Sequence, residues 1–289
     1  MGIVYLNLTI FGVLGNTFLL YLYIFKFFTG SRTRHIDLII IHLAFVNIAI
    51  IFGGGIPKTM QVWGLKSFLD ASGGKTISYF QRLFWDLSLC SPFLLSVFQA
   101  ITISPNSPRW AKLKTKASKY IILCCVLCWI FNLLIDIAVA AYIVDLKNSS
   151  KGTWNIGYSS LDLDHMNTIK IVIWKSVYEG VLLSLMAIAS GYMMLVLYRH
   201  HHQVQHIHSV STHRGSPEIR ATKNILLLVS TYICFNTISF PFIIYIAPSR
   251  ETRNWVIQVM VFFSLCYPAV SPIMLIIKDT QIHASSCIL

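Results

Sequence analysis

Two pairs of oppositely charged residues lie four positions apart in stretches that are otherwise apolar. Arg82 and Asp86 form one pair, and Lys175 and Glu179 form the other. Residues four apart share one face of a helix, so each pair can neutralise itself there. Asp136 lies deeper, in another apolar stretch. Ionisable groups are costly in hydrocarbon, so these suggest the polar rim or floor of a binding pocket. The alternative is that each pair serves only itself and reaches towards the membrane interface.

Other residue patterns do not predict catalysis. The sequence has no HExxH, GxSxG or paired-carboxylate arrangement, so we do not expect an enzyme. The GGKT stretch at Gly73–Thr76 has Leu69 where a phosphate-binding loop needs a glycine. Cys124–Cys128 (CCxxC) and the pair His202 and His206 have metal-like spacings, but they lie in an apolar helix and at a basic helix end. We therefore expect no metal and no cofactor.

The composition places the chain in a membrane. Of its 289 residues, 55% are hydrophobic and 12% are charged, whereas soluble domains carry about 25% charged residues. The net charge of +12 would suggest nucleic acid as a partner in a soluble protein. In a membrane protein, basic residues gather in cytoplasmic loops and against anionic lipid. We expect a lipid bilayer and no nucleic acid as the partner.

Seven apolar segments predict an all-α membrane protein, a seven-transmembrane helix bundle that forms one domain over residues 1–289. Each is about long enough to cross a hydrocarbon core as a helix. The glycines of Gly53–Gly55, followed by Pro57, predict an irregular turn in the second span. The segments are residues 2–25, 36–57, 79–103, 120–144, 169–198, 222–247 and 255–277.

The distribution of basic residues predicts the orientation. The stretch Arg109–Lys119 carries five cations and no acid, which is typical of a cytoplasmic loop. We therefore expect the N-terminus outside and the C-terminus in the cytoplasm. Asn148 then begins an N-glycosylation sequon in an external loop. The sequence shows neither an internal repeat, which many transporters have, nor a filter loop, which a channel usually has. Both classes are therefore disfavoured, although a pore formed by several copies of the chain stays open as an alternative.

Several ordered stretches resemble the vomeronasal type-1 receptors, a family of seven-helix G-protein-coupled pheromone receptors. The resemblance covers nearly the whole chain. Bitter taste receptors have a similar sequence pattern and are the alternative family. The stretches that carry the resemblance are GVLGNTFLL, RHIDLIIIHLAFVN, LLSVFQAITISP with SPRWAKLK, YRHHHQVQHIH, RGSPEIRATKNILLLVSTY and YPAVSPIMLIIKD.

The resemblance implies a plasma-membrane receptor that binds a small-molecule chemosignal between the outer halves of its helices. A heterotrimeric G protein of the Gi/Go type would bind inside. The family lacks the acidic-arginine-aromatic motif of most rhodopsin-like receptors, and Gln99, Thr102 and Ser104 stand near that position. Neutral hydrogen bonds and packing must then hold the resting state.

The candidate site residues form two groups, one at each end of the bundle. We expect helix six to hinge near Pro241, because proline removes a backbone hydrogen bond. The ligand-binding candidates are Arg82, Asp86, Lys175, Tyr178, Glu179, Phe242 and Tyr245. The candidates for the G-protein face are Gln99, Thr102, Ser104, Arg109, Lys112, Arg214, Arg220 and Lys223.

One departure from the family concerns a disulfide. The family usually pairs a cysteine above helix three with one in the second external loop. Gly74 and Ser159 stand at these two positions in this chain. We therefore expect no external disulfide. The second external loop should be looser as a result, because a loop-closing disulfide is typically worth about 2–4 kcal/mol.

Overall fold

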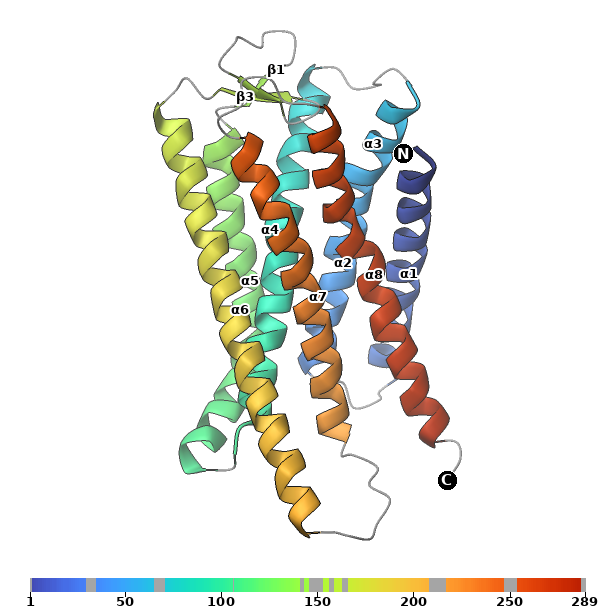
Figure 1. The fold of residues 1–289 in the computed structure, drawn as a ribbon, viewed down its shortest axis with the longest axis vertical. Helices are drawn as coiled ribbons and strands as arrows, with labels where there is room; N and C mark the ends of the chain where they lie inside the picture. Colours follow the sequence, from blue (N-terminus) through green and yellow to red (C-terminus); the bar gives the residue numbers. More distant parts are fainter. Residues whose placement is uncertain are drawn as a thin grey trace.

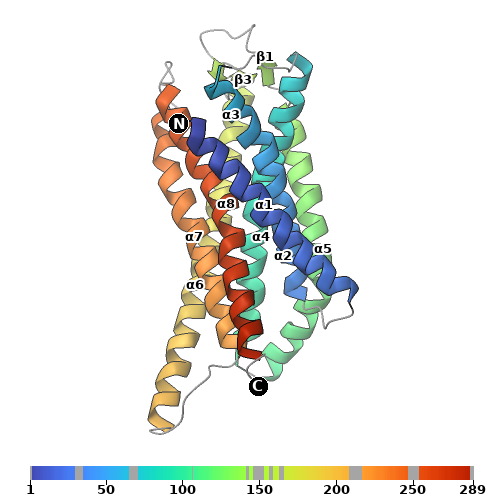
Figure 2. The same cartoon turned by 90° about the vertical axis from the view of Figure 1, so that its right-hand side faces the viewer.

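The chain forms an elongated bundle of helices whose two ends lie far apart along the helix direction (Figure 1). The computed structural model describes residues 2–29, 35–64, 71–105, 107–140, 143–145, 153–155, 159–162, 166–207, 217–246 and 254–286. The N-terminus lies at the end that carries a small sheet, and the C-terminus lies at the opposite end (Figures 1 and 2). An odd number of spans produces this arrangement.

Seven helical spans are present in the described residues. Backbone groups in hydrocarbon must be satisfied within the chain, so helices are the expected spanning elements. The helices are α1 (Gly2–Phe28), α2 (His35–Ile50), α3 (Ile56–Val62), α4 (Ala71–Ile103), α5 (Pro108–Ala140), α6 (Met166–Ile207), α7 (Pro217–Ile246) and α8 (Asn254–Ser286). The second span comprises α2, the π-helical turn η1 (Ile51–Gly55) and α3.

Length and composition alone identify five of these spans within the described residues. The five stretches are Gly2–Phe28, Ile36–Met60, Thr76–Ile103, Lys119–Ile137 and Ile173–Arg199, and a shorter apolar helix covers Val261–Ile276. The helices α7 and α8 pack against each other, and α7 also packs against α4 and α6. The all-α, seven-helix fold predicted from the sequence is thus present.

The irregular turn predicted at Gly53–Gly55 is the π-helical turn η1. A π turn adds one residue to a helical turn, and it often occurs near functional sites. Its glycines allow close contact with α1: a Cβ built on Gly55 would lie 2.8 Å from the Thr9 hydroxyl oxygen. The second span therefore changes its helical register where it passes α1.

A three-stranded antiparallel sheet covers one end of the bundle, between α5 and α6. Its strands are β1 (Ile143–Asp145), β2 (Thr153–Asn155) and β3 (Ser159–Asp162), in the order β1-β3-β2. The prediction that the fourth span extends to Val144 is corrected here. Ile143 and Val144 pair with Leu161 and Ser160 instead, because β-branched residues also suit a strand.

The helix α4 occupies the centre of the bundle. It packs against α2, α5, α6 and α7, as well as β1 and β3. In its most apolar window 61% of the residues are buried, against 22% in α1 and 17% in α5. Side chains on α4 can therefore contact residues of four other long helices and of the sheet.

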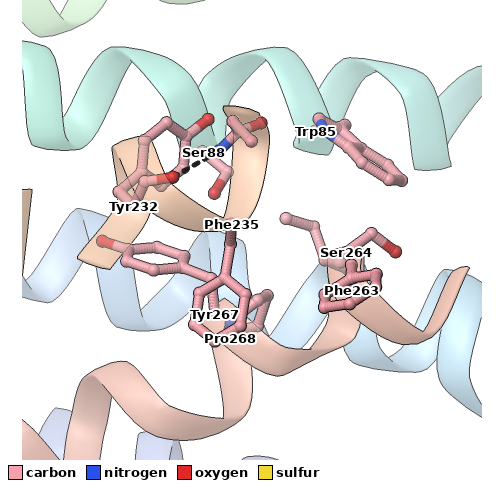
Figure 3. A pocket seen from close by; sticks show the side chains of 10 residues that line it. Trp85, Ser88, Tyr232, Phe235, Phe263, Ser264, Tyr267 and Pro268 are labelled. Atoms are coloured by element: carbon pink, nitrogen blue, oxygen red, sulfur yellow. Dashed lines mark hydrogen bonds between the residues drawn. The ribbon is translucent and has the colours of Figure 1, made fainter. Parts of the chain in front are cut away.

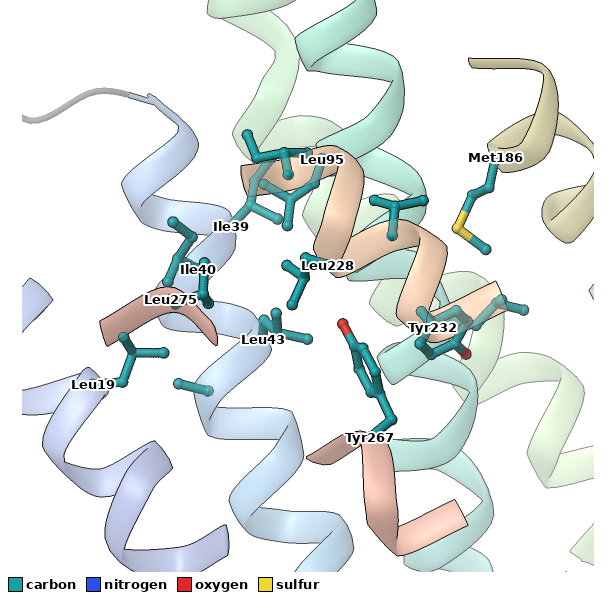
Figure 4. Close-up of a cluster of buried hydrophobic side chains, with 14 of the residues drawn as sticks. Leu19, Ile39, Ile40, Leu43, Leu95, Met186, Leu228, Tyr232, Tyr267 and Leu275 are labelled. Carbon is teal, nitrogen blue, oxygen red and sulfur yellow. The ribbon is translucent and has the colours of Figure 1, made fainter. Parts of the chain in front are cut away.

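Apolar side chains fill the half of the bundle nearer the C-terminus (Figure 4). Leu43 of α2, Leu228 of α7 and Tyr267 of α8 converge there (Figure 4). A hydrogen-bonded group lies beside this core, where the Asn47 amide donates to Asn16 Oδ1 at 3.1 Å and Ser271 Oγ at 2.9 Å. These bonds join α1, α2 and α8.

Candidate functional site

One lysine joins three helices in the half of the bundle that carries the sheet. Lys175 Nζ on α6 lies 2.7 Å from Asp86 Oδ2 on α4 and 3.1 Å from Asp136 Oδ1 on α5. The two aspartate side chains are only 2% and 1% exposed. Buried charges of opposite sign attract strongly in a low-dielectric interior. The cluster therefore clamps α4, α5 and α6 together.

The sequence left open whether Lys175 pairs with Glu179 on its own helix or contributes to a pocket. In the structure its ion pairs go to Asp86 and Asp136 on two facing helices. Facing helices can bring a carboxylate closer than the next helical turn does. Glu179 remains near enough to Lys175 and Arg82 for electrostatic attraction. The Arg82 Nε is buried and has no hydrogen-bond partner among the residues that the structure describes.

Tyr178 lies beside a group of thiols and does not line the cavity described below. Its hydroxyl is 3.8 Å from the Cys90 sulfur, and its ring centroid is 5.2 Å from that of Phe131. The Asn132 amide donates to the Cys90 sulfur at 3.4 Å and to the Cys128 carbonyl at 2.7 Å. These contacts link α4, α5 and α6 next to the charged cluster, on its side away from the sheet.

A small cavity lies on another face of α4, between α4, α7 and α8 (Figure 3). Its volume is about 20 Å³, which gives room for about one water molecule. Trp85 and Ser88 of α4 face Phe263 and Ser264 of α8 (Figure 3). The full lining is Ile50, Trp85, Ser88, Tyr232, Phe235, Asn236, Phe263, Ser264, Tyr267 and Pro268.

The opposite end of α4 is tied to α7 by a neutral hydrogen bond. The Gln99 amide nitrogen donates to the Thr222 hydroxyl oxygen at 2.6 Å. The two residues are 2% and 0% exposed. The resemblance described above implies that Gln99 stands near the position of the charged switch found in most rhodopsin-like receptors. This bond joins α4 and α7 near the ends that lie away from the sheet.

Ser104 ties the same end of α4 to α6. Its hydroxyl lies 2.9 Å from the Tyr192 hydroxyl, and Lys114 donates to its backbone carbonyl at 2.8 Å. The Tyr192 ring stacks on Trp110 of α5 with centroids 6.5 Å apart. Thr102, by contrast, is exposed, and within the described part of the chain its hydroxyl donates to the Phe98 carbonyl of its own helix.

Among the remaining candidates, Lys112 and Lys223 are exposed near the start of α5 and α7. The six cysteines of the described residues are free, while Gly74 lies in α4 and Ser159 in β3. Phe242, Tyr245, Arg109 and Arg220 lie in described helices, but their side chains are outside the description, and Arg214 and Asn148 lie outside the described residues.

The sequence pointed to several of the residues in these contacts but did not show which residues they interact with. Asp136 was recognised as a costly intramembrane acid, but its lysine was not assigned. The acidic and basic residues predicted within the membrane could have indicated this partner, because an isolated acid in hydrocarbon needs a cation nearby. Thr222, Tyr192 and Asn236 gave no comparable signal, since a threonine, a tyrosine or an asparagine is common in helices of every orientation.

Comparison with known proteins identifies the family. The sequence matches the family described as "Vomeronasal organ pheromone receptor family" over residues 1–286. This chain belongs to the vomeronasal type-1 receptor family. It is therefore a chemosensory G-protein-coupled receptor of the plasma membrane and not an enzyme, as the sequence predicted.

Individual relatives cover almost the full chain. The human "Vomeronasal type-1 receptor 3" is 40% identical over 98% of this chain and 92% of its own length. The zebrafish (Danio rerio) "Olfactory receptor class A-like protein 1" is 30% identical over 94% of this chain and 87% of its own. Squid rhodopsin has the same fold, with a TM-score of 0.72 at 14% identity over 95% of this chain and 75% of its own.

Proposed function

We propose that this receptor binds a small-molecule chemosignal in the half of the bundle that carries the sheet, and activates a Gi/Go-type G protein at the other end. That orientation puts the N-terminus outside. It also puts the start of α5, which carries the basic stretch, on the cytoplasmic side with the C-terminus (Figure 1). The known bias of basic residues towards the cytoplasm supports this orientation.

The observation that carries the proposal is the buried bond between Gln99 and Thr222. G-protein binding requires the inner ends of the helices to separate, and this bond holds α4 against α7. A ligand shifts the balance between resting and active packings only if it binds the active packing more tightly. Pro241 lies in α7 near the end that carries the sheet, and we expect the helix to hinge there, because proline removes a backbone hydrogen bond.

The test is ligand-dependent G-protein activation in cells that express the receptor. A panel of odorants and steroids is screened, and the response is measured with and without pertussis toxin, which inactivates Gi/Go. We expect a response that the toxin abolishes. Scrambling the residues between α4 and α5, or between α6 and α7, should remove the response while the receptor stays at the surface.

Two outcomes contradict the proposal. A ligand-gated current in cells without the G protein would show that the chain acts as a channel. A ligand response that persists in full with pertussis toxin would show coupling to another class of G protein.

A further inference from the structure

We infer that the first turns of α5 bind the headgroup of a phosphoinositide lipid that carries at least two phosphate monoesters. The residues that bind it are Lys112, Lys116 and Lys119, which we call the lysine row. This inference rests on the proposed orientation, which places the start of α5 at the cytoplasmic surface (Figure 1). It goes beyond the proposed function, because the lipid is a second ligand that binds apart from the chemosignal.

The three lysines lie on one face of α5. They are spaced four and then three residues apart. Successive residues of an α-helix are turned by about 100°, so the three side chains leave the helix within a sector of about 60° and along roughly 10 Å of its axis. All three are exposed. The lysine row therefore presents three ammonium groups that one small ligand can contact together.

The lysine row continues the face that α5 presents to lipid. The same turn of about 100° per residue brings Leu123, Leu127 and Leu134 into the sector of the lysines. These leucines are 50%, 53% and 64% exposed, as expected for side chains that face hydrocarbon. The lysines therefore point outward from the bundle at the edge of the bilayer. Lys112 was also a candidate for the G-protein face, and its outward direction favours lipid as its partner.

Tyr120 marks the depth of the lysine row in the membrane. This residue is 47% exposed and follows Lys119 at the start of the apolar segment. Tyrosine is enriched where hydrocarbon meets the headgroups. Lys116 and Lys119 lie within about 6 Å of Tyr120 along the helix axis, and one headgroup layer is about 5–8 Å thick. Their ammonium groups are therefore at the level of the lipid phosphates, with Lys112 one turn further into the water.

No carboxylate of the same helix neutralises the lysine row. The sequence of α5 contains no aspartate or glutamate before Asp136, which lies near the other end of the helix and pairs with Lys175. Lys114 points to the opposite side of α5, where it donates to the Ser104 carbonyl. Lysine clusters beside the cytoplasmic end of a spanning helix attract anionic lipids, and each lysine adds to the attraction. The row thus offers three positive charges to an anionic partner outside the bundle.

A multivalent headgroup suits the lysine row better than several singly charged lipids. Each phosphate monoester carries about 1.5 to 2 negative charges at neutral pH, so one phosphoinositide with two monoesters can neutralise all three lysines. Phosphatidylserine carries a single net negative charge, so several molecules would have to be ordered to do the same. Each ordered molecule costs free energy on binding. We therefore assign the row to a phosphoinositide and not to phosphatidylserine.

The test counts the lipids bound to the purified receptor by native mass spectrometry. The receptor in an uncharged detergent is titrated with phosphatidylinositol bisphosphate, with phosphatidylserine and with soluble inositol trisphosphate. We expect the bisphosphate lipid to bind at least about tenfold more tightly than phosphatidylserine. It should also bind more tightly than the soluble trisphosphate, because only the lipid places acyl chains on the apolar face of α5. Added salt should weaken the binding, since exposed charges are screened.

A matched pair of variants tests the position of the site. Lys116→Gln should weaken binding of the bisphosphate lipid about fivefold, the contribution of one lysine near the surface. Lys114→Gln removes the same charge from the opposite side of α5 and should change binding by less than about twofold. Lys223→Gln, at an exposed site of α7, is a second control. The triple change Lys112→Gln, Lys116→Gln and Lys119→Gln should weaken binding about 100-fold, whereas arginine at the same three positions should preserve it.

Specific outcomes overturn the inference. It fails if phosphatidylserine or the soluble trisphosphate binds as tightly as the bisphosphate lipid, or if Lys114→Gln and Lys116→Gln weaken binding equally. It also fails if the triple variant loses a receptor dimer and no lipid, because the lysine row is then an interface between two copies of the chain. The lipid series on the natural chain decides the matter even if a variant does not fold.

Failure of this inference and failure of the proposed function can be told apart. Lipid binding to the purified receptor needs neither a chemosignal nor a G protein. Selective binding of the bisphosphate lipid without G-protein activation in cells would refute the proposed function alone. Ligand-dependent activation by a receptor that does not distinguish the lipids would refute only this inference.

Discussion

Lys175 has a carboxylate partner on each of two neighbouring helices. Both aspartates are almost fully buried, so neither can be hydrated if the ammonium is removed. An ion pair of this kind contributes little net stability compared with an apolar core, but breaking it leaves an uncompensated charge. The cost of removing one partner is therefore much larger than the value of the intact cluster.

Lys175→Met should destabilise the receptor by about 3–5 kcal/mol, because it leaves two buried carboxylates without their cation. The unfolding temperature of the purified receptor and its surface expression measure the effect. Lys112→Met, at an exposed site, is the control and should change little. The triple change Lys175→Met, Asp86→Asn and Asp136→Asn should recover part of the loss, and no recovery would contradict the electrostatic explanation.

Gln99→Ala should raise ligand-independent G-protein activation about 2–10-fold, the effect of losing one buried hydrogen bond that favours the resting packing. Thr222→Val should raise the basal activity in the same way. The double variant should add little to either single variant, because both substitutions break the same Gln99–Thr222 bond. Thr102→Ala, which removes only a bond within α4, is the control. Basal activity that stays unchanged in both single variants would show that the bond does not hold the resting state.

At the scale of elements, α1 shows how one narrow face of a membrane-spanning helix packs against its neighbours. Its buried residues are Tyr5, Thr9, Gly12, Asn16, Leu19 and Tyr23, a spacing of alternately four and three that makes one narrow stripe. Small residues in such a stripe let membrane helices approach closely. A Cβ built on Gly12 would lie 2.6 Å from Ile51 Cδ1 and 3.3 Å from the Ala269 Cα.

Gly12→Ala should therefore destabilise the receptor by about 1–3 kcal/mol, because the contact between α1, η1 and α8 becomes overpacked. Thermal unfolding of the purified variant measures this. Gly191→Ala is the matched control, since nothing lies within 4 Å of a Cβ at that site. The control should be neutral or stabilising by up to about 1 kcal/mol, because alanine favours a helix over glycine. Equal effects at both sites would argue against overpacking.

For the whole molecule, orientation is the property on which the proposed function depends. The termini lie at opposite ends of the bundle (Figures 1 and 2). If the sheet end is outside, the sequon at Asn148 reaches the lumenal glycosylation machinery during synthesis.

Treatment of the expressed receptor with N-glycosidase should then increase its gel mobility, and Asn148→Gln should remove the shift. Asn7 begins a second sequon within α1, where the machinery does not reach, so Asn7→Gln serves as the control and should leave the shift intact. An unglycosylated natural chain whose C-terminus is accessible outside intact cells would reverse the proposed orientation.

Local composition determined the helices of this protein. Hydrocarbon requires about twenty apolar residues in a helix, so the seven spans and the irregular turn at Gly53–Gly55 could be predicted without tertiary information. The start of α5 could not, because this helix begins at Pro108, well before the apolar segment that starts at residue 120. Polar residues continue a helix in water as readily as apolar ones do in lipid.

The sequence alone also marked which residues were unusual, namely the charges in apolar stretches and the neutral residues at the end of α4 away from the sheet. Only the tertiary structure decided their partners: Lys175 with Asp86 and Asp136, and Gln99 with Thr222. Residues 123 positions apart can meet only through packing. Helix packing depends on the shape of many side chains together, which no local pattern contains, whereas the cost of burying a charge is a property of the residue itself.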